Sequence, residues 1–420
     1  MKTRLNILIV AYACSPYQGS EPGVGWGFVN ELSKHHNLWV IVEEDKFRSD
    51  IEKYCEYTPL NSNVNFVFIK KKRAKLLRKL WPPSYYLFYR AWHRKAFHAA
   101  NILHKQHHFD LVHQLTMVGY REPGYLYEMK IPFVWGPIGG LGFFPKRFLS
   151  VLGFRMGVYY CAYNLVNWLQ MHFGIRVHKA LDWISKNGAL IAATSENLNS
   201  VKRMRPDIDG IVLSEVGVDK LKNAEPNYRN PGDTLHIVWS GLNIPRKGLY
   251  LALMALTQIP GDINYHLHIQ GDGPLRPEMQ SLAKRLGLGR KVTFYGWVER
   301  SVARAIMRRS HLMLITSLRD LTSTVTIEAL SNALPVICLD HCGFSDVIDH
   351  TCGIKIKVTK PAHVISRISR EICFLEKNEI VRQRLSEGAL AKSTDFIWEN
   401  KVKTVLKVYD QVVENSKKSL

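Results

Sequence analysis

The chain is 420 residues long and 46% hydrophobic, a composition normal for a globular protein and sufficient for two domains. Its formal net charge of +21 calls for an anionic partner, either a nucleic acid, a nucleotide-linked substrate or an acidic membrane surface. The seven scattered cysteines include no C-x-x-C pair, which argues against a disulfide framework or zinc ribbon and fits a reducing cytoplasm.

The N-terminal residues fit either a signal with a lipid-attachment cysteine, Cys14, or a first strand. The stretch before Cys14 is short for a signal, and a glycine-rich loop, 14–25, follows at once. We therefore predict a buried strand over Leu5–Ala11 and a helix over about 24–34. A loop between such elements lets backbone approach a phosphate, although a tight turn is the alternative.

The most basic run of the chain, Lys70–Arg73 with Lys75, Arg78 and Lys79, leads into an aromatic cluster ending at Trp92. Cations beside amphipathic rings suit an anionic membrane surface, so peripheral membrane contact through residues 70–92 is one prediction. The alternative is a solvated basic face over a packed aromatic helix. No nucleic-acid motif accompanies the run, and nucleic acid is not expected as a partner.

The rest of the first half alternates strands and helices. Strands are expected at 38–42, 64–69, 109–114, 133–135, 189–194 and 211–216. His113 lies where the third of these ends, a position at which doubly wound domains place chemistry. The loop 136–140 either lines an acceptor site or is a simple turn, and the aromatic helical stretch 153–184 is interpreted as core. Polar residues interrupt 148–173, so no transmembrane span is expected.

Asn, Pro and Gly throughout residues 219–233 indicate an interdomain linker. A second domain begins with the strand Leu235–Ser240, then Gly241 and the cation pair Arg246-Lys247, which suits a diphosphate. A strand at 266–270 is followed by a turn with Gly271 and Gly273. A strand at 292–295 is followed by Trp297 and Val298, and all four residues are candidates for the site. Cys338, His341 and Cys342 lack a second ligand pair and are interpreted as ordinary buried residues, so no metal is expected.

The stretch 311–339 predicts a strand, a polar turn, a helix and another strand, which is a parallel crossover. The turn holds Asp320 and Thr322-Ser323-Thr324, and the helix begins near Val325. Free N–H groups at a helix N-terminus favour a phosphate, and Glu328, one turn further, could reach a ribose or sugar hydroxyl. The alternative is that Ser323 or Thr324 only caps the helix.

Asp320 and Glu328 are acidic residues separated by seven others, and Ala329 and the sequence Leu334-Pro335-Val336 follow them. This pattern resembles the retaining family 4 glycosyltransferases of GT-B architecture, in a branch that acts in polysaccharide biosynthesis. The chain departs from the family in having Asp320 where Glu is usual. The resemblance covers nearly the whole chain and is strongest from Leu235 to Gly353.

The resemblance implies an α/β, GT-B fold of two Rossmann-like domains facing across a cleft. The implied boundaries are 1–218 for the acceptor-side domain, 219–233 for the linker, 234–395 for the nucleotide-sugar domain and 396–420 for a helix crossing back. The implied reaction moves a sugar from a nucleotide-sugar to a hydroxyl of a glycan or lipid-linked glycan, with retention. The expected location follows from the cysteines and from the basic aromatic segment 70–92: it is the cytoplasm, peripheral on the inner face of the cytoplasmic membrane.

The resemblance also implies roles for single residues. Arg246 and Lys247 would neutralise the leaving diphosphate, together with the N–H groups near Thr322–Val325, so that no metal or cofactor is needed. Ser240, Gly241, Gly271 and Gly273 would approach the donor, the backbone at Trp297-Val298 would recognise the base, and Glu328 would bind the ribose. Asp320 and His113 would contact the sugar or acceptor, and Gly19 and Ser20 would lie opposite the diphosphate.

Two other classes of function stay open at this stage. One is a GT-B enzyme of another reaction, such as a nucleotide-sugar epimerase. The other is a non-catalytic protein that kept the fold and binds membrane or nucleic acid. The Arg246-Lys247 pair and Glu328 argue against the second class, whereas the substitution at Asp320 argues for it.

Overall fold

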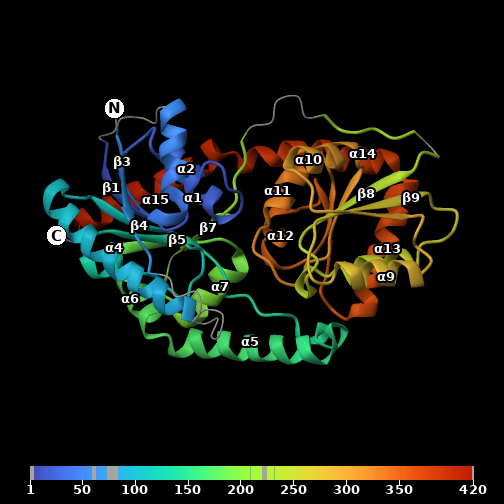
Figure 1. Cartoon of the computed structure of the whole chain (residues 1–420), viewed down its shortest axis with the longest axis horizontal. Coiled ribbons are helices and arrows are strands. Elements are labelled where there is room, and N and C mark those ends of the chain that lie inside the picture. The colour runs from blue at the N-terminus through green and yellow to red at the C-terminus, as the bar shows by residue number, and fades with distance from the viewer. Residues whose placement is uncertain are drawn as a thin grey trace. The chain divides into compact units, whose positions relative to one another are not determined.

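The computed structural model describes residues 4–58, 63–72, 84–208, 210–219, 225–230 and 232–418. Contacts divide the chain into two compact units. The first unit comprises Met1–Leu141, Leu169–Gly217 and Trp398–Leu420, and the second comprises Gly142–Trp168 and Val218–Ile397. Each unit contains one sheet with helices on both of its faces (Figure 1).

The first unit is built on a seven-stranded sheet of order β3-β2-β1-β4-β5-β6-β7, in which every pairing is parallel. Its strands are β1 Asn6–Ala11, β2 Asn37–Glu43, β3 Val64–Ile69, β4 Leu111–Thr116, β5 Phe133–Ile138, β6 Gly188–Ala192 and β7 Gly210–Val212. Its helices are α1 Glu21–Leu32, α2 Glu44–Tyr57, α4 Tyr85–His107, α6 Ile175–Asn187, α7 Ser195–Met204, α15 Trp398–Lys418 and a short 3-10 turn, Leu126–Met129. Near-continuous apolar runs such as β1 are buried on both faces, as parallel sheets require.

The C-terminal helix α15 packs in the first unit although it follows the second unit in sequence. The indole of Trp398 lies so close to Gly27 of α1 and to Gly217 that a Cβ at either glycine would come within 2.2 to 2.5 Å of it. Phe28 adds an edge contact, with ring centroids 5.2 Å apart. A side chain at Gly27 or Gly217 would therefore displace the start of α15.

The second unit is built on a six-stranded parallel sheet of order β10-β9-β8-β11-β12-β13. Its strands are β8 Leu235–Ser240, β9 Tyr265–Gln270, β10 Val292–Gly296, β11 Leu312–Ile315, β12 Val336–Leu339 and β13 Gly353–Ile356. Its helices are α8 Leu249–Leu256, α9 Arg276–Arg285, α10 Arg300–Arg309, α11 Thr324–Ser331, α12 Cys342–Val347, α13 Pro361–Lys377 and α14 Glu379–Ser393, with 3-10 turns at Lys146–Phe148, Ser150–Leu152, Pro245–Lys247 and Thr394–Phe396.

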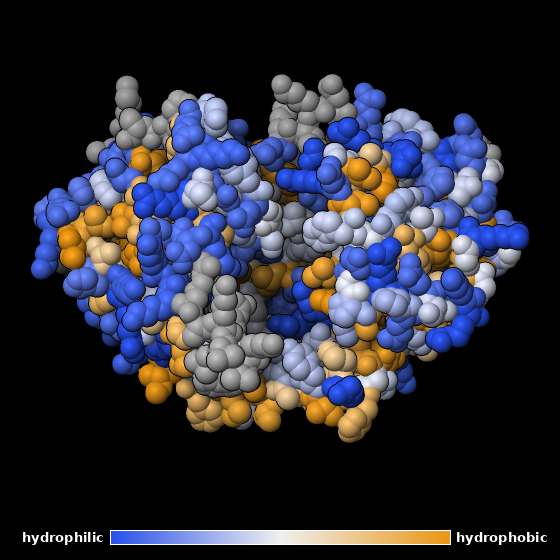
Figure 2. Space-filling view, in the orientation of Figure 1, coloured by the Kyte–Doolittle hydropathy of each residue, from blue (hydrophilic) through white to orange (hydrophobic). Residues whose placement is uncertain are grey.

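The segment 142–168, predicted in the first domain, groups with the second unit. Phe144, Phe148 and Tyr160 are buried in the hydrophobic core that also contains Trp239 of β8. The helical stretch predicted over 153–184 is two helices, α5 Gly153–Phe173 and α6, interrupted at Gly174. Figure 2 shows hydrophobic residues gathered where α5 lies in Figure 1. No helix among the described residues is long and apolar enough to cross a membrane.

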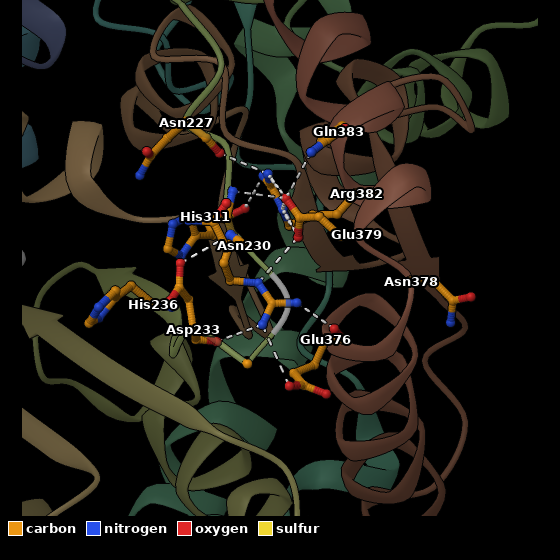
Figure 3. Close-up of polar contacts among 12 residues, drawn as sticks. Asn227, Asn230, Asp233, His236, His311, Glu376, Asn378, Glu379, Arg382 and Gln383 are labelled. Carbon is orange, nitrogen blue, oxygen red and sulfur yellow. Dashed lines mark hydrogen bonds and ion pairs between the residues drawn. The ribbon is translucent and has the colours of Figure 1, made fainter.

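The second half of the predicted linker is held to the second unit by two buried arginines (Figure 3). Arg229 Nε donates to Glu379 Oε2 at 3.2 Å, and Arg382 Nε donates to the same oxygen at 2.9 Å. Arg382 Nη2 also donates to the Asn227 carbonyl at 2.8 Å. The shared carboxylate and carbonyl keep both buried guanidiniums paired, as burial of charge requires.

Residues 73–83 of the basic segment lie outside the described part of the chain. Within the described part, Lys71 is buried, its Nζ donates to the Tyr12 hydroxyl at 2.9 Å and it lies 3.8 Å from the centre of the Tyr85 ring. Tyr89 and Trp92 are also buried. These residues of the predicted membrane segment are therefore core.

Candidate active site

The predicted donor-site residues of the second unit follow the carboxyl ends of four neighbouring strands. Ser240 ends β8 and Gly241 follows it, Gly271 follows β9, Trp297 follows β10, and Asp320 comes after β11. In the sheet these strands lie in the order β10-β9-β8-β11. The topology therefore places the candidates along one edge of one sheet, which is where open α/β sheets bind ligands.

The turn that holds Arg246 and Lys247 is fixed to the end of β11. Gly248 ends this turn with φ of +66°, and a Cβ there would lie 2.2 Å from the Thr316 carbonyl oxygen. Thr316 Oγ1 donates to the Lys247 carbonyl at 3.0 Å and accepts from Trp239 Nε1 at 3.0 Å. Only glycine fits this left-handed, crowded position, so Gly248 sets where the two cations lie.

Arg246 and Lys247 share one carboxylate. Arg246 Nη1 donates to the Arg319 carbonyl at 2.9 Å and to Asp320 Oδ1 at 3.4 Å. Lys247 Nζ pairs with Asp320 Oδ2. Arg246 is 29% exposed, Lys247 is 12% exposed and Asp320 is 15% exposed, so water screens the ion pairs only in part. Two cations facing one carboxylate leave net positive charge, which suits an anionic ligand.

The polar turn before α11 is close-packed, and its Ser323 has φ of +64°. Thr322 is buried, and a Cβ on Gly343 would lie 2.6 Å from the Thr322 Cα. The Ser323 side chain makes no capping hydrogen bond to α11. The first N–H groups of a helix have no partner within it, so those of Thr324 and Val325 can receive an anion.

Glu328 lies one turn into α11 and is half-buried. Burial raises the pKa of its carboxyl group, while Arg300 and Arg304 act to lower it. Arg300 Nη2 is 3.6 Å from Glu328 Oε1, but this arginine is mostly exposed. A partly desolvated carboxylate that is only weakly paired can accept hydrogen bonds from ligand hydroxyls.

The glycines of this edge permit close backbone approach. Gly271 has φ of +109°, and a Cβ there would lie 2.0 Å from the Gly241 carbonyl oxygen. Gly273 has φ of +153°, and its Cβ would lie 2.8 Å from the Asn243 carbonyl oxygen. Beyond β10, Trp297 is exposed and Val298 is half-buried.

Gly19 and Ser20 lie in the first unit, in the exposed loop between β1 and α1. Ser20 precedes α1 with φ of +57° and makes no side-chain cap. The next residue, Glu21, accepts a hydrogen bond from the Val118 N–H at 2.5 Å, which ties this loop to the chain following β4. Burial raises the pKa of Glu21. The loop after β1 and the chain after β4 both lie at the carboxyl edge of the first sheet.

His113 does not face a ligand site. It is fully buried, its Nδ1 is 2.6 Å from the Tyr409 hydroxyl and its Nε2 is 2.7 Å from the Gly136 carbonyl oxygen. The carbonyl can only accept, so Nε2 carries the proton and Nδ1 accepts from the tyrosine. Burial lowers the pKa of His113 to about 4. The prediction that His113 contacts sugar or acceptor is corrected, because both ring nitrogens are used within the core.

Three residues near Asp320 were not predicted. The Arg319 guanidinium lies 3.9 Å from the centre of the Tyr163 ring and donates to the hydroxyl of that tyrosine. Cys342 Sγ accepts from the Asp320 N–H at 3.3 Å. Tyr163 is more than 150 residues before Arg319, so no local pattern relates them. Arg319 is adjacent to Asp320 in sequence, and this adjacency is the one sequence feature that points to Arg319 as part of the site.

Comparison with known proteins agrees with this architecture. Residues 222–392 match the family described as "Glycosyl transferases group 1". An uncharacterised glycosyltransferase of Methanocaldococcus jannaschii is 24% identical over 183 residues, which are 43% of this chain and 46% of that protein. The lipopolysaccharide core biosynthesis glycosyltransferase LpsD of Rhizobium meliloti is 26% identical over 179 residues, 40% of this chain and 50% of LpsD. The chain thus spans about half the length of the curated relatives it matches.

Among solved structures, HepE of Anabaena in complex with UDP superposes with a TM-score of 0.60 at 15% identity. The alignment covers 99% of this chain and 100% of HepE. At that identity the likeness establishes the fold, and the fold is that of two Rossmann-like units. Together, these findings show that residues 222–392 are similar to the group 1 glycosyl transferases, in a chain of GT-B architecture.

Proposed function

We propose that the chain transfers a sugar from a nucleotide-sugar donor to a hydroxyl group of a glycan or lipid-linked glycan. The observation that carries the proposal is the Arg246-Lys247-Asp320 cluster beside the N-terminus of α11. The name of LpsD supports a role in surface polysaccharide synthesis, and the UDP bound to HepE supports a nucleoside diphosphate as the leaving group.

The leaving diphosphate gains negative charge as its bond to the anomeric carbon breaks. Arg246, Lys247 and the N–H groups at the start of α11 stabilise that charge, and such preorganised electrostatics is usually the largest catalytic contribution. The acceptor oxygen attacks the same face that the diphosphate leaves, and a phosphate oxygen takes the acceptor proton. This route retains the anomeric configuration and needs neither a metal nor a cofactor.

The remaining candidates position the donor. Glu328 accepts hydrogen bonds from the ribose hydroxyls, and Asp320 contacts the transferred sugar. The turns at Gly241 and Gly271 let backbone approach the diphosphate, and the backbone at Trp297 and Val298 recognises the base.

For localisation, we propose a cytoplasmic enzyme at the inner face of the membrane. The exposed Lys70 and Lys72 supply charge for anionic headgroups, whereas the buried Lys71 does not. A variant with serine at positions 70 and 72 should bind anionic liposomes more weakly than the parent at low salt. Equal binding by parent and variant would remove this part of the proposal.

Thermal stabilisation by a panel of nucleoside diphosphates and nucleotide-sugars tests the donor site. A ligand that binds the folded state must raise the melting temperature. The parent should respond to one nucleotide class, and Arg246→Ala/Lys247→Ala should not. The matched control is Lys284→Ala/Arg285→Ala, an exposed cation pair at the end of α9 in the same unit. Equal shifts in all three proteins would overturn the proposed site.

A further inference from the structure

The first unit contains a pocket of about 610 Å³ that none of the roles above uses. It lies between the start of α4, the chain after β4 and the junction of α5 with α6. Its lining combines three arginines and one carboxylate, which are Arg90, Arg121, Arg176 and Glu122, with apolar side chains that include Leu87, Phe173 and Ile175.

The polar side of the pocket is preorganised by the buried carboxylate of Glu122. Its Oε1 accepts from Arg90 Nε at 2.7 Å and from Arg176 Nη2 at 3.1 Å, and its Oε2 contacts Arg176 Nη1 at 2.8 Å. Glu122 is 6% exposed, whereas Arg90 is 42% exposed. One buried carboxylate thus orients two guanidiniums, and the Nη groups of Arg90 stay available for a bidentate anion such as phosphate.

The topology adds to this positive character. Helices α4 and α6 each precede a strand of the parallel sheet, β4 and β6, so their N-termini lie at its carboxyl edge. A helix N-terminus carries partial positive charge and favours anions. The pocket therefore lies at the ligand-binding edge of the sheet. There the arginine side chains and the two helix N-termini both contribute positive charge.

The other side of the pocket is apolar and open to solvent. Leu87 is 47% exposed, Phe173 is 69% exposed and Ile175 is 71% exposed. Gln170 Oε1 is buried and has no hydrogen-bond partner among the described residues.

We propose that this pocket binds an amphiphilic phosphate, with the phosphate on Arg90 and Arg176 and a hydrocarbon chain along Leu87, Phe173 and Ile175. The bound group is then the lipid-phosphate part of a lipid-linked acceptor, an assignment that rests on the proposed function. The lining holds three arginines and one carboxylate, so its net positive charge favours the phosphate. The exposed apolar side chains favour contact with the hydrocarbon chain of the ligand.

Calorimetric titration of the full chain with three probes tests the site. Farnesyl phosphate carries both a hydrocarbon chain and a phosphate group. Farnesol carries only the hydrocarbon chain, and inorganic phosphate carries only the charge. We expect farnesyl phosphate to bind at least about 10-fold more tightly than either of the others. Arg90→Gln should weaken its binding by about 10-fold, the value of one charge-assisted hydrogen bond. Leu87→Gln should weaken it as well.

The controls are Arg94→Gln and Ile102→Gln, both on α4 and outside the pocket. Ile102 and Leu87 are both aliphatic and equally exposed at 47%, so the two substitutions are matched in exposure and differ in position. Equal losses in Arg94→Gln and Arg90→Gln would indicate general charge attraction and overturn the inference. Farnesol binding as tightly as farnesyl phosphate would also overturn it.

Nucleoside diphosphate binding, measured in the same variants, separates the two proposals. A protein that responds to a nucleotide but not to farnesyl phosphate loses only the pocket inference. A protein that binds farnesyl phosphate but no nucleotide loses the proposed function and keeps an amphiphile site.

Discussion

Changing Asp320 to Asn should strengthen binding of a nucleoside diphosphate while it slows sugar transfer. Asn has nearly the same shape, so the loop should keep its position, but Arg246 and Lys247 lose the carboxylate they share. A phosphate held by the same two cations would lie roughly 5 Å from that carboxylate. At an effective dielectric constant of about 20, two unit charges at this separation repel by about 3 kcal/mol.

The three side chains are partly exposed, so solvent screening reduces this repulsion to about 1–2 kcal/mol. Affinity for the diphosphate should therefore rise about 5- to 30-fold in Asp320→Asn. Transfer should fall, because the carboxylate contact to the sugar is lost. Calorimetry with the nucleoside diphosphate gives the first quantity, and nucleotide release from the nucleotide-sugar gives the second. The control is Asp262→Asn, an exposed acid paired with Lys377. Weaker diphosphate binding in Asp320→Asn would refute the electrostatic reasoning.

Three further outcomes follow from buried or half-buried groups. Glu328→Gln should raise the donor KM by about 10-fold. Because burial raises the pKa of Glu328, donor binding in the parent should weaken as pH falls toward that raised value, and the Gln variant should lack this dependence in titrations across pH. Burial lowers the pKa of Lys401 to about 7, below the unfolded value of about 10.4, so the folded chain binds fewer protons between these values. Stability should rise with pH in that window by up to about 1.4 kcal/mol per unit, and urea midpoints should show a smaller slope in Lys401→Met. His113→Asn should lower the free energy of unfolding by about 2–4 kcal/mol without changing transfer per folded molecule, whereas a selective loss of transfer would make His113 catalytic.

The acid dependence of His113 has a definite sign. Its pKa in the folded chain is about 4, below the unfolded value of about 6.5. The stability it contributes is therefore complete above pH 6.5 and is lost as pH falls from 6.5 toward 4. The loss amounts to about 3 kcal/mol, and His113→Asn should remove this part of the acid sensitivity.

The second-unit site could be predicted because its determinants are local in sequence. A strand, a polar turn and a helix lie within 311–331, and a strand precedes Arg246-Lys247 by a few residues. Parallel strands end at a common edge, so the pattern alone brings Arg246 and Asp320 to one side of a sheet. Their ion pairing then depends on Gly248, whose left-handed conformation the sequence pattern does not reveal.

Contacts between distant residues could not be predicted from local patterns. His113 looks like a site residue at the end of a strand, but its hydrogen-bond partner, Tyr409, is 296 residues later. Segment 142–168 has the aromatic content of any core helix, and it is tertiary packing, in a core shared with residues such as Trp239, that groups it with the second unit. The pocket beside Glu122 likewise joins three separate parts of the chain, and nothing in their spacing indicates it.

The most direct test of the central claim compares a nucleoside diphosphate with its parent nucleoside. The claim is that Arg246 and Lys247 bind the diphosphate, so the two phosphates should add about 100-fold or more to affinity in the parent chain. That gain should disappear in Arg246→Ala/Lys247→Ala and persist in Lys284→Ala/Arg285→Ala. A gain that survives loss of Arg246 and Lys247 would place the diphosphate elsewhere and contradict the account.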